Sequence, residues 1–315
     1  MRRIYLDHAA TTPVRAEAAA AMLPLLDAHN PSSLHAEGRA ARAALDAARE
    51  TVARILHASP RESVFTGGGS ESDVLAIVGA ARALRERGRH VVTTAIEHHA
   101  VLHAVDVLAR DGWRVTRLAV DGRGLVDPAR FVDALAPDTT VASIALANNE
   151  LGVVQPIAEL ARDAHARGVV FHTDAVQAPA WLPIDVEALG VDLLSLSAHK
   201  LGGPKGVGLL YVRRGIAIEP LVVGGPQEHG LRAGTEDVAG IAGFATALAV
   251  AERERDAVAP RVASLRDRLE RAIVDAVPGT IVNGRGAPRL PNLLSVAFEE
   301  VASDALLIRL DLEGI

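Results

Sequence analysis

A lysine that follows an apolar segment is the residue best placed for chemistry in this chain. Lys200 comes directly after Ser197-Ala-His199 and opens into a glycine-rich turn at 202–206. This pattern predicts a primary amine at the carboxyl end of a buried strand. The hydroxyl of Ser197 and the ring of His199 are donors suited to a phosphate group. An amine in such a position can form a Schiff base with a carbonyl compound.

A carboxylate ends another apolar segment, at 169–174. Parallel α/β sheets bind their ligands at the carboxyl ends of the strands, so Asp174 can face a pyridinium nitrogen and keep it protonated. The alternative is that Asp174 caps the following helix. Gln177 lies one turn further on, where its amide can reach a ring hydroxyl.

Polar or small residues also follow three other expected strands. Gly69 and Ser70 open a helix after a glycine run, where backbone N–H groups can bind phosphate; a capped tight turn is the alternative. His98 can stack on a cofactor ring and shuttle protons, or form an ordinary surface pair with His99. Asn149 offers an amide donor or simply makes a turn.

A loop of Arg232, Ala233, Gly234 and Thr235 precedes the longest expected helix. Arg232 and Thr235 can bind an anion there, or they can cap the helix.

Apolar segments alternate with amphipathic ones along most of the chain. Such alternation predicts an α/β protein with a mostly parallel, seven-stranded sheet covered by helices on both faces. The last two segments are joined by a short turn and are expected to pair as an antiparallel hairpin. The expected strands are 63–66, 90–95, 115–120, 140–147, 169–174, 193–197 and 208–212.

The pattern changes after about residue 235. A long charged helix is expected at 237–277, then strands near 280–282 and 292–298, and a last helix at 303–312. This predicts a large domain at 14–250 and a smaller α+β domain formed by 1–13 and 251–315.

The overall composition is that of an ordinary globular protein. Of the 315 residues 49% are hydrophobic and 23% charged, and the formal charge of −6 argues against a nucleic-acid partner. No segment has the length and apolarity of a membrane span or signal peptide, so a cytoplasmic protein is expected. The absence of cysteine excludes disulfides, thiolate metal sites and thiol catalysis by these residues.

The candidate residues converge once they are placed on the predicted sheet. Phosphate donors, an aromatic ring, a carboxylate and an amine all follow strand ends at one edge of it. This is the set of groups that pyridoxal 5'-phosphate (PLP) requires.

In their order, these motifs resemble the cysteine desulfurases of the class V aminotransferase group. The similarity extends from about residue 3 to residue 315. The matching segments are Tyr5-Leu-Asp-His-Ala-Ala-Thr-Thr-Pro13, Asn30-Pro-Ser-Ser-Leu-His35, Glu97-His-His-Ala-Val-Leu102, Ala147-Asn-Asn-Glu150, His172-Thr-Asp-Ala-Val-Gln177 and Ser197-Ala-His-Lys200.

The resemblance implies a fold type I PLP enzyme that forms a homodimer. It implies that Lys200 holds the cofactor covalently, His98 stacks on its ring and Asp174 pairs with the ring nitrogen. Gln177 and Asn149 would lie near the ring hydroxyl and the substrate carboxylate. The implied phosphate ligands are Gly69, Ser70, Ser197 and His199, with Thr235 reaching the phosphate of the partner subunit.

The family reaction converts L-cysteine to L-alanine and leaves a persulfide on a catalytic cysteine. The sulfur then passes to an acceptor protein for iron–sulfur clusters or tRNA thiolation. In the family, a segment like 310–315 leads into the mobile loop that carries this cysteine. The chain is therefore expected to be a C-terminally truncated desulfurase that is inactive as given. A smaller departure is Val74, where relatives commonly carry asparagine.

Two other functions stay open on the sequence. One is a different class V lyase, epimerase or aminotransferase that needs no cysteine, because fold and cofactor do not fix the reaction. The other is a PLP-binding or dimerising scaffold without turnover.

Overall fold

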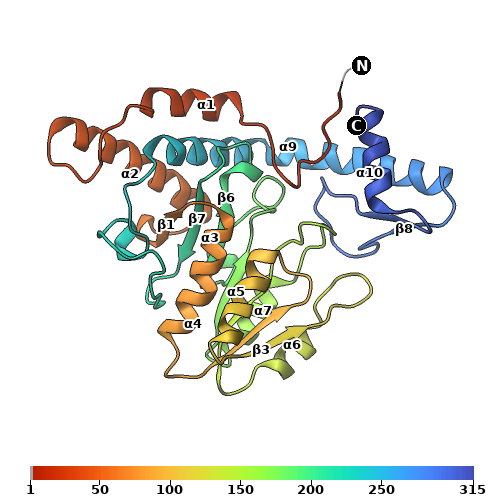
Figure 1. The fold of residues 1–315 in the computed structure, drawn as a ribbon, viewed down its shortest axis with the longest axis horizontal. Coiled ribbons are helices and arrows are strands. Elements are labelled where there is room, and N and C mark those ends of the chain that lie inside the picture. The colour runs from red at the N-terminus through yellow and green to blue at the C-terminus, as the bar shows by residue number, and fades with distance from the viewer. Residues whose placement is uncertain (1–2) are drawn as a thin grey trace.

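The computed structural model describes residues 3–315, and a seven-stranded sheet forms its centre (Figure 1). The strand order is β1-β7-β6-β5-β4-β2-β3. Neighbours from β6 to β3 are parallel, whereas β7 is antiparallel to both β6 and β1, as expected for the hairpin. The strands are β1 (Ser63–Thr66), β2 (His90–Thr94), β3 (Arg114–Leu118), β4 (Thr139–Ser143), β5 (Val170–Asp174), β6 (Leu193–Ser197) and β7 (Gly208–Val212).

Successive side chains of one strand enter different cores, which is why the strands have nearly unbroken apolar sequences. In β6, Leu193 packs into the core that contains Val101 of α5, while Leu194 packs into the core that contains Leu45 of α2. Both leucines are fully buried. The predicted α/β class with a mostly parallel sheet is confirmed.

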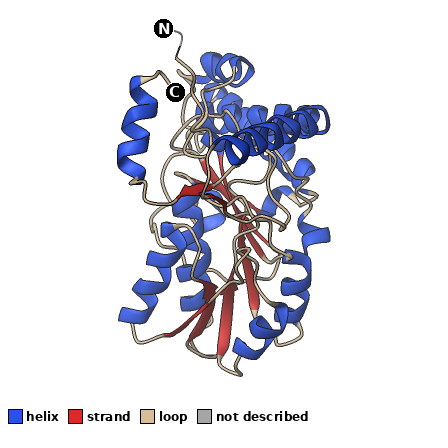
Figure 2. Ribbon diagram, turned by 90° about the vertical axis from the view of Figure 1, so that its right-hand side faces the viewer, coloured by secondary structure: helices blue, strands red, loops and turns tan. Residues whose placement is uncertain are grey.

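Helices cover both faces of this sheet (Figure 2). The first core packs against α2, α6, α7 and α9, and the second against the helical run from α3 to α4 and against α5. The helices up to α8, with two short 3-10 turns and one π-helical stretch (η3), are α1 (Ala16–Met22), η1 (Leu23–Leu25), α2 (Ala36–Leu56), η2 (Pro60–Glu62), α3 (Gly69–Val74), η3 (Leu75–Gly79), α4 (Ala80–Ala83), α5 (His99–Arg110), α6 (Pro128–Ala134), α7 (Ile157–His165) and α8 (Val186–Leu189).

The long helix α9 (Val238–Ala276) connects the large sheet to a second, smaller one (Figure 1). Asp237 caps its start by accepting a hydrogen bond from Gly240 N at 2.9 Å. Its first part is buried against α1 and α2, and the chain then forms an antiparallel pair and a last helix. These elements are β8 (Thr280–Val282), β9 (Val296–Phe298) and α10 (Ser303–Leu312). The domain boundaries at 13/14 and 250/251 stay a prediction.

A few boundaries differ from the sequence expectation. The strand expected at 140–147 ends at Ser143, but the chain continues to pair with β5, since Leu146 N donates to Asp174 O at 2.9 Å. The strand expected at 292–298 shortens to β9. The helical run after the glycine-rich turn begins at Gly69 and is wider than an α-helix over the fully buried η3.

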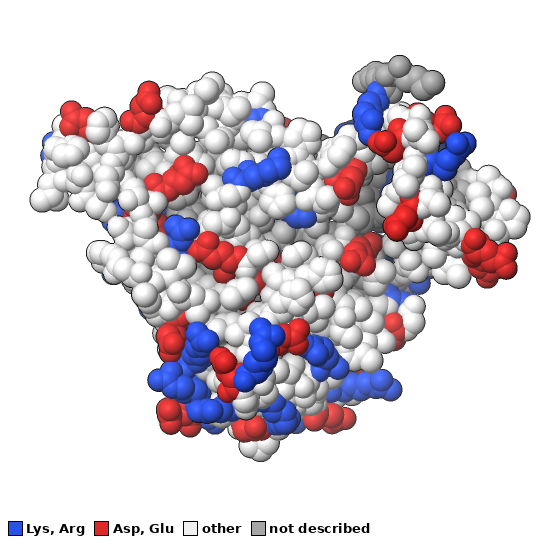
Figure 3. All heavy atoms as spheres, viewed as in Figure 1, with Lys and Arg blue, Asp and Glu red and all other residues white. Residues whose placement is uncertain are grey.

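Charged side chains gather at the end of the molecule that holds α4, β3 and α6 (Figure 3). Arginines and acids alternate there in exposed pairs such as Arg114 with Asp138 at 2.6 Å and Arg85 with Glu219 at 2.9 Å. Opposite charges are therefore paired at this end of the molecule. Over residues 3–315 no helix has the length and apolar character that a bilayer crossing needs.

Candidate active site

A cavity of about 240 Å³ opens where β1, β2, β4, β5 and β6 end. Its walls contain every residue predicted for the site except Thr235. The structure therefore brings nine of the ten predicted residues together, although their roles stay predictions. The lining residues are Ala10, Gly69, Ser70, Asp73, His98, Ala145, Ala147, Asn149, Asp174, Val176, Gln177, Ser197, His199 and Lys200.

Lys200 reaches the cavity from a short turn, η4 (Ala198–Lys200), that directly follows β6. Its Nζ donates hydrogen bonds to the carbonyl oxygens of Ala9 and Ala10, the latter at 2.9 Å. Burial lowers the pKa of the Lys200 amine, an effect that the nearby carboxylates of Asp174 and Asp7 oppose. A lysine of lowered pKa is a better nucleophile at neutral pH.

Asp174 ends β5 and is 7% exposed. Its Oδ1 accepts a hydrogen bond from Val176 N at 2.9 Å. Burial raises the pKa of the Asp174 carboxyl, and the charges of His98 and Lys200 lower it. Asp174 therefore bonds to the following turn and also lines the cavity, so the two readings of the sequence are compatible.

His98 is the N-cap of α5 and accepts a hydrogen bond from Ala100 N through Nδ1 at 3.1 Å. Burial lowers the pKa of the His98 ring, with Asp174 opposing the shift. A neutral imidazole next to the Lys200 amine can stack on a ring or exchange protons.

Several other residues that line the cavity are small or carry a hydroxyl group. Gly69 opens α3 so close to β6 that a Cβ on it would lie 2.8 Å from Val176 Cγ2 and 3.3 Å from Ser197 Cβ. Ser70 and His199 lie on the same cavity wall, and His199 Nδ1 is 3.1 Å from Thr11 Oγ1. The glycine leaves space and exposed N–H groups at the start of the helical run, which suits a phosphate.

Two amide side chains complete the wall. Gln177 donates through Nε2 to Ala9 O at 3.0 Å, so it and Lys200 share an acceptor in the N-terminal segment. Asn149 lines the cavity while its neighbour Asn148 holds the turn, with Oδ1 accepting from Glu150 N and Leu151 N.

Thr235 and Arg232 do not reach this cavity. Arg232 Nε donates to Glu71 Oε1 at 2.9 Å, and Glu71 Oε2 accepts from Gly67 N at 2.7 Å. Arg232 therefore holds the glycine-rich turn in place through Glu71, and its charge is already paired. Thr235 is exposed just before α9, and its predicted contact with the phosphate of a partner subunit stays a prediction.

Sequence reasoning missed one ionisable residue of the cavity, Asp73. It lies in α3, is 1% exposed and faces His172 of β5 at 3.7 Å. Desolvation raises the pKa of the Asp73 carboxyl well above its ordinary value. A signal was available: Asp73 is followed directly by the apolar run 74–78, so an exposed position was unlikely on periodicity alone.

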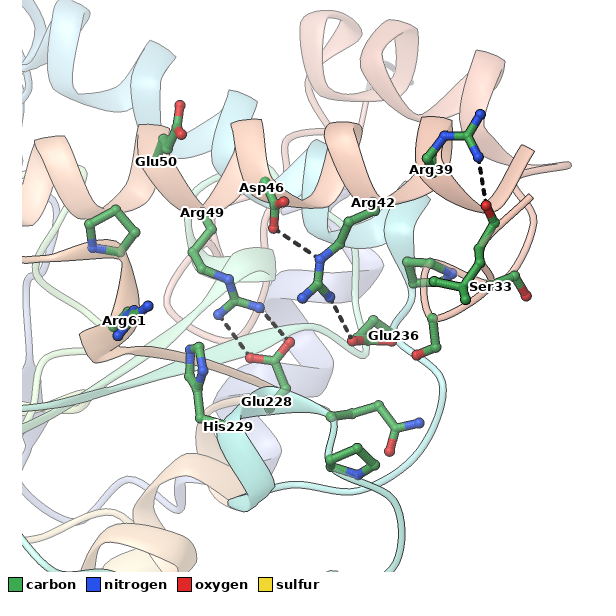
Figure 4. Close-up of a pocket in the computed structure, with 16 residues that line it drawn as sticks. Ser33, Arg39, Arg42, Asp46, Arg49, Glu50, Arg61, Glu228, His229 and Glu236 are labelled. Carbon is green, nitrogen blue, oxygen red and sulfur yellow. Dashed lines mark hydrogen bonds and ion pairs between the residues drawn. The ribbon is translucent and has the colours of Figure 1, made fainter. Parts of the chain in front are cut away.

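A larger cavity of about 730 Å³ lies elsewhere, between α2 and the loop at 226–236. Figure 4 shows Arg49 facing Glu228, and Arg42 between Asp46 and Glu236. Opposite charges pair across this cavity, and it has neither a lysine nor a carboxylate at a strand end. The smaller cavity is the better candidate for an active site.

Comparison with known proteins identifies the family of this chain. The family model described as aminotransferase class-V matches residues 4–315. Cysteine desulfurase IscS of Dictyoglomus turgidum is 46% identical over 316 residues, which cover 100% of this chain and 80% of that relative. The chain belongs to the cysteine desulfurases of the class V aminotransferase family. Cysteine desulfurase IscS of Methanosarcina thermophila is 45% identical and matches 100% of this chain and 78% of its own length.

Solved desulfurase-like structures share the fold. A NifS-like protein superposes with a TM-score of 0.95 at 37% identity and covers 99% of this chain and 86% of its own. A structure titled SspA in complex with cysteine superposes with a TM-score of 0.86 at 37% identity, covering 98% of this chain and 86% of its own. The predicted family, enzyme class and fold are thereby confirmed.

Proposed function

We propose that this chain binds PLP in the Lys200 cavity and acts on L-cysteine as a cysteine desulfurase. The observation that carries the proposal is the convergence of the Lys200 amine, the Asp174 carboxylate and the His98 ring on one cavity at the carboxyl ends of the strands. The names of the relatives point the same way, and one structural neighbour is titled as a complex with cysteine.

The residues present fit PLP. The space that a Cβ on Gly69 would fill lies beside the hydroxyl of Ser197, and this side offers donors for the phosphate. Ser70 and His199 would complete that set. Asp174 would hold the ring nitrogen, and the buried position of its carboxylate strengthens a charge-assisted hydrogen bond to a pyridinium. Gln177 and Asn149 would hold the ring hydroxyl and the substrate carboxylate.

When bound, PLP supplies an electron-withdrawing ring that stabilises negative charge on the Cα of an amino acid. Lys200 Nζ would hold the cofactor and, as an amine of lowered pKa, accept a proton from the substrate's Cα. His98 would orient the ring and can accept or return a proton at the substrate sulfur.

The sulfur transfer needs a thiol that these 315 residues do not contain. In a balanced reaction, L-cysteine and a thiol RSH give L-alanine and the persulfide RSSH. The carbon–sulfur bond breaks, a sulfur–sulfur bond forms, and the thiol proton replaces sulfur on the alanine methyl. We propose that the thiol is supplied by a group outside these 315 residues, and that the persulfide sulfur passes to an acceptor protein.

A homodimer is part of the proposal. Thr235 lies outside the cavity of its own chain, which is consistent with a contact to a second copy. Exposed apolar side chains near the larger cavity, Leu34 at 89% and Val223 at 78%, would be covered in a dimer. Light scattering of the purified protein tests this part.

The function is tested with the purified 315-residue protein. We expect borohydride to fix PLP on one peptide, the one containing Lys200, as read by mass spectrometry. L-cysteine should then perturb the cofactor absorbance, and a small thiol added in excess over L-cysteine, which is itself a thiol, should raise the rate of alanine release. D-cysteine serves as the matched control, because it has the same groups in the wrong arrangement about Cα.

Each other outcome would count against the proposal in a defined way. Transamination of a different amino acid, with no response to cysteine, would favour another class V enzyme. Bound PLP with no response to any amino acid would favour a scaffold. Failure to bind PLP would refute the proposed cofactor.

A further inference from the structure

Two carboxyl groups line the Lys200 cavity, and a third lies close to them. Asp174 and Asp73 both line it, and Glu97 lies close enough for its charge to act on Asp73. All three are more than nine-tenths buried, with exposures of 7% for Asp174, 1% for Asp73 and 7% for Glu97. Three anions this close in a buried wall would repel one another strongly.

Asp73 has no cation to balance its charge within residues 3–315. Its one basic neighbour in ion-pair range is His172, with Nε2 3.7 Å from Asp73 Oδ1. Both nitrogens of that ring are engaged by hydroxyls, Nδ1 with Ser143 Oγ at 2.8 Å and Nε2 with Ser195 Oγ at 2.9 Å. Burial lowers the pKa of His172 to about 3, so the ring is neutral.

The Asp73 carboxyl group is also incompletely bonded. Its Oδ1 is buried and has no hydrogen-bond partner in the described chain. The hydroxyl of Ser195, from β6, is the polar group that stabilises the Asp73 anion, whereas desolvation, Asp174 and Glu97 all act against it. Burying the Asp73 anion with so few hydrogen-bond donors would cost much free energy. Burying the neutral carboxylic acid costs far less.

Asp174 has the opposite surroundings. It faces the amine of Lys200 and the ring of His98, both of which favour its anion, and it accepts a hydrogen bond from Val176 N. Of two neighbouring carboxyl groups, the one next to the Lys200 amine is the one that ionises, and the other keeps its proton.

Glu97, the third buried carboxyl group, accepts more hydrogen bonds than Asp73 does. Its oxygens accept from Thr94 Oγ1 at 2.6 Å and from Ala145 N at 3.0 Å. Burial nevertheless raises the pKa of Glu97 to about 8, so this group is also mostly protonated at neutral pH.

We propose that Asp73 is a positioning residue for the ring nitrogen of the cofactor: it stays protonated, so that Asp174 carries the negative charge of this wall alone. The inference rests on the proposed function, since the ring nitrogen belongs to PLP. An ionised Asp73 would share a proton with Asp174, and Asp174 would lose part of the charge that holds a pyridinium. Asp73 thus acts through Asp174 and not on the substrate.

The first test uses the protein without PLP. Infrared spectra at neutral pH record the carbonyl absorption of protonated carboxylic acids. We expect Asp73→Asn to lose one buried carboxylic-acid band and Glu97→Gln to lose a different one, while Asp174→Asn loses none. If Asp73→Asn does not fold, the Glu97→Gln protein must still show a buried carboxylic-acid band. Absence of a band that depends on Asp73, or of any band in Glu97→Gln, would overturn the proposal.

The second test measures PLP affinity by equilibrium titration across pH. Asparagine imitates a protonated aspartic acid, so Asp73→Asn should bind PLP within about threefold of the unaltered protein, with the same pH profile. Asp174→Asn should lose about tenfold or more. A comparable loss in Asp73→Asn, or a shifted profile, would show that Asp73 is ionised. If the unaltered protein fails to bind PLP, the proposed function fails, whereas the infrared result on Asp73 stands independently.

Discussion

At the scale of single residues, burial has a larger effect on the site than any one charged partner. It is the largest cause of the lowered pKa values of Lys200 and His98 and of the raised pKa of Asp174. The attraction between Asp174 and the two basic groups opposes these shifts, whereas the charge of Lys200 lowers the pKa of His98 further. The cavity therefore holds an amine of lowered pKa beside a carboxyl group whose anion its basic neighbours favour, which suits covalent binding of a carbonyl cofactor.

Lys200→Ala should abolish covalent binding of PLP and leave the thermal unfolding midpoint nearly unchanged. The hydrogen bonds of its Nζ go to two carbonyl groups of the N-terminal segment, so the loss to the fold is small. Borohydride reduction followed by mass spectrometry gives the yield of adduct. The chain offers a matched control, because Lys205 is its only other lysine and is exposed. Full adduct yield in Lys200→Ala, or its loss in Lys205→Ala, would contradict the assignment.

Asp174→Asn keeps the shape of the side chain and the acceptor for Val176 N but removes the charge. A charge-assisted hydrogen bond is worth about 1.5–3 kcal/mol, so PLP should bind about tenfold more weakly or worse. The cofactor absorbance should also report a less acidic ring. Fluorescence titration of the variant and the unaltered protein measures the affinity. Equal affinities would mean that Asp174 only caps the turn after β5.

At the scale of elements, the sequence predicts best the strands that are buried along their whole length. The runs 63–66, 193–197 and 208–212 coincide with β1, β6 and β7. The sequence predicts less well where pairing is made by the backbone alone, as after Ser143, or where a single helical run changes its width, as at η3. Apolar periodicity records which side chains are buried, and it does not record the hydrogen-bond pattern within a helix.

The close approach of α3 to β6 is an element-level feature that Gly69→Ala should disturb. The new Cβ would lie 2.8 Å from Val176 Cγ2, so α3 or the turn after β5 must shift. The proposed phosphate site at the start of α3 would then widen. Binding of both PLP and inorganic phosphate should weaken by about tenfold, the loss of one good charge-assisted hydrogen bond. Isothermal titration measures both ligands.

Gly122→Ala provides the control for this substitution. A Cβ at Gly122 would meet no atom within 4 Å, and the residue does not have the positive φ that favours glycine. Its ligand affinities should equal those of the unaltered protein. If Gly69→Ala bound phosphate equally well, the start of α3 would not be the phosphate site.

The burial of Glu97 makes stability depend on pH. The pKa of Glu97 rises from an ordinary 4.5 to about 8 on folding, so between these values the folded chain binds more protons than the unfolded one. Stability from this group is complete below about pH 4.5 and is lost as pH rises toward 8, by at most about 1.4 kcal/mol per pH unit. Denaturant unfolding of the unaltered protein and of Glu97→Gln over this range should show a shallower fall for the variant. If the free energy of unfolding fell equally with pH in both proteins, Glu97 would not be protonated in the folded chain.

At the scale of the whole molecule, the sequence predicts which residues lie at the edge of the sheet that forms the cavity. It does not predict which charged residues pair when they are far apart in the sequence. The carboxyl ends of parallel strands must meet, so Asp174, Lys200 and Asn149 could be placed together from their positions alone. The partners of Asp73 and of Arg49 could not be placed, because they depend on how α3 and α2 pack against distant parts of the chain. Such pairings depend on tertiary packing and leave no periodic pattern in the sequence.

The ion pair of Arg49 and Glu228 is the clearest of these long-range contacts. Arg49 of α2 binds Glu228 through two hydrogen bonds, of 2.9 and 2.6 Å, and Glu228 also accepts from Phe65 N of β1 at 2.8 Å. The side chains are 9% and 2% exposed. Glu228 and the next residue, His229, have φ values of 46° and 60°, so the pair secures a strained loop against the sheet.

Arg49→Met should therefore destabilise the protein by about 3–5 kcal/mol, because it leaves the buried Glu228 carboxylate without its cation. Replacing both partners at once, with Arg49→Met and Glu228→Gln, should recover part of that loss, since no buried charge then remains unpaired. The control is the exposed pair of Arg114 and Asp138, each 50% exposed, where Arg114→Met should cost about 1 kcal/mol or less. Chemical denaturation of the four proteins measures the free energies of unfolding. Equal losses in Arg49→Met and Arg114→Met would mean that water reaches Glu228 and that the loop at 226–236 is not held by this pair.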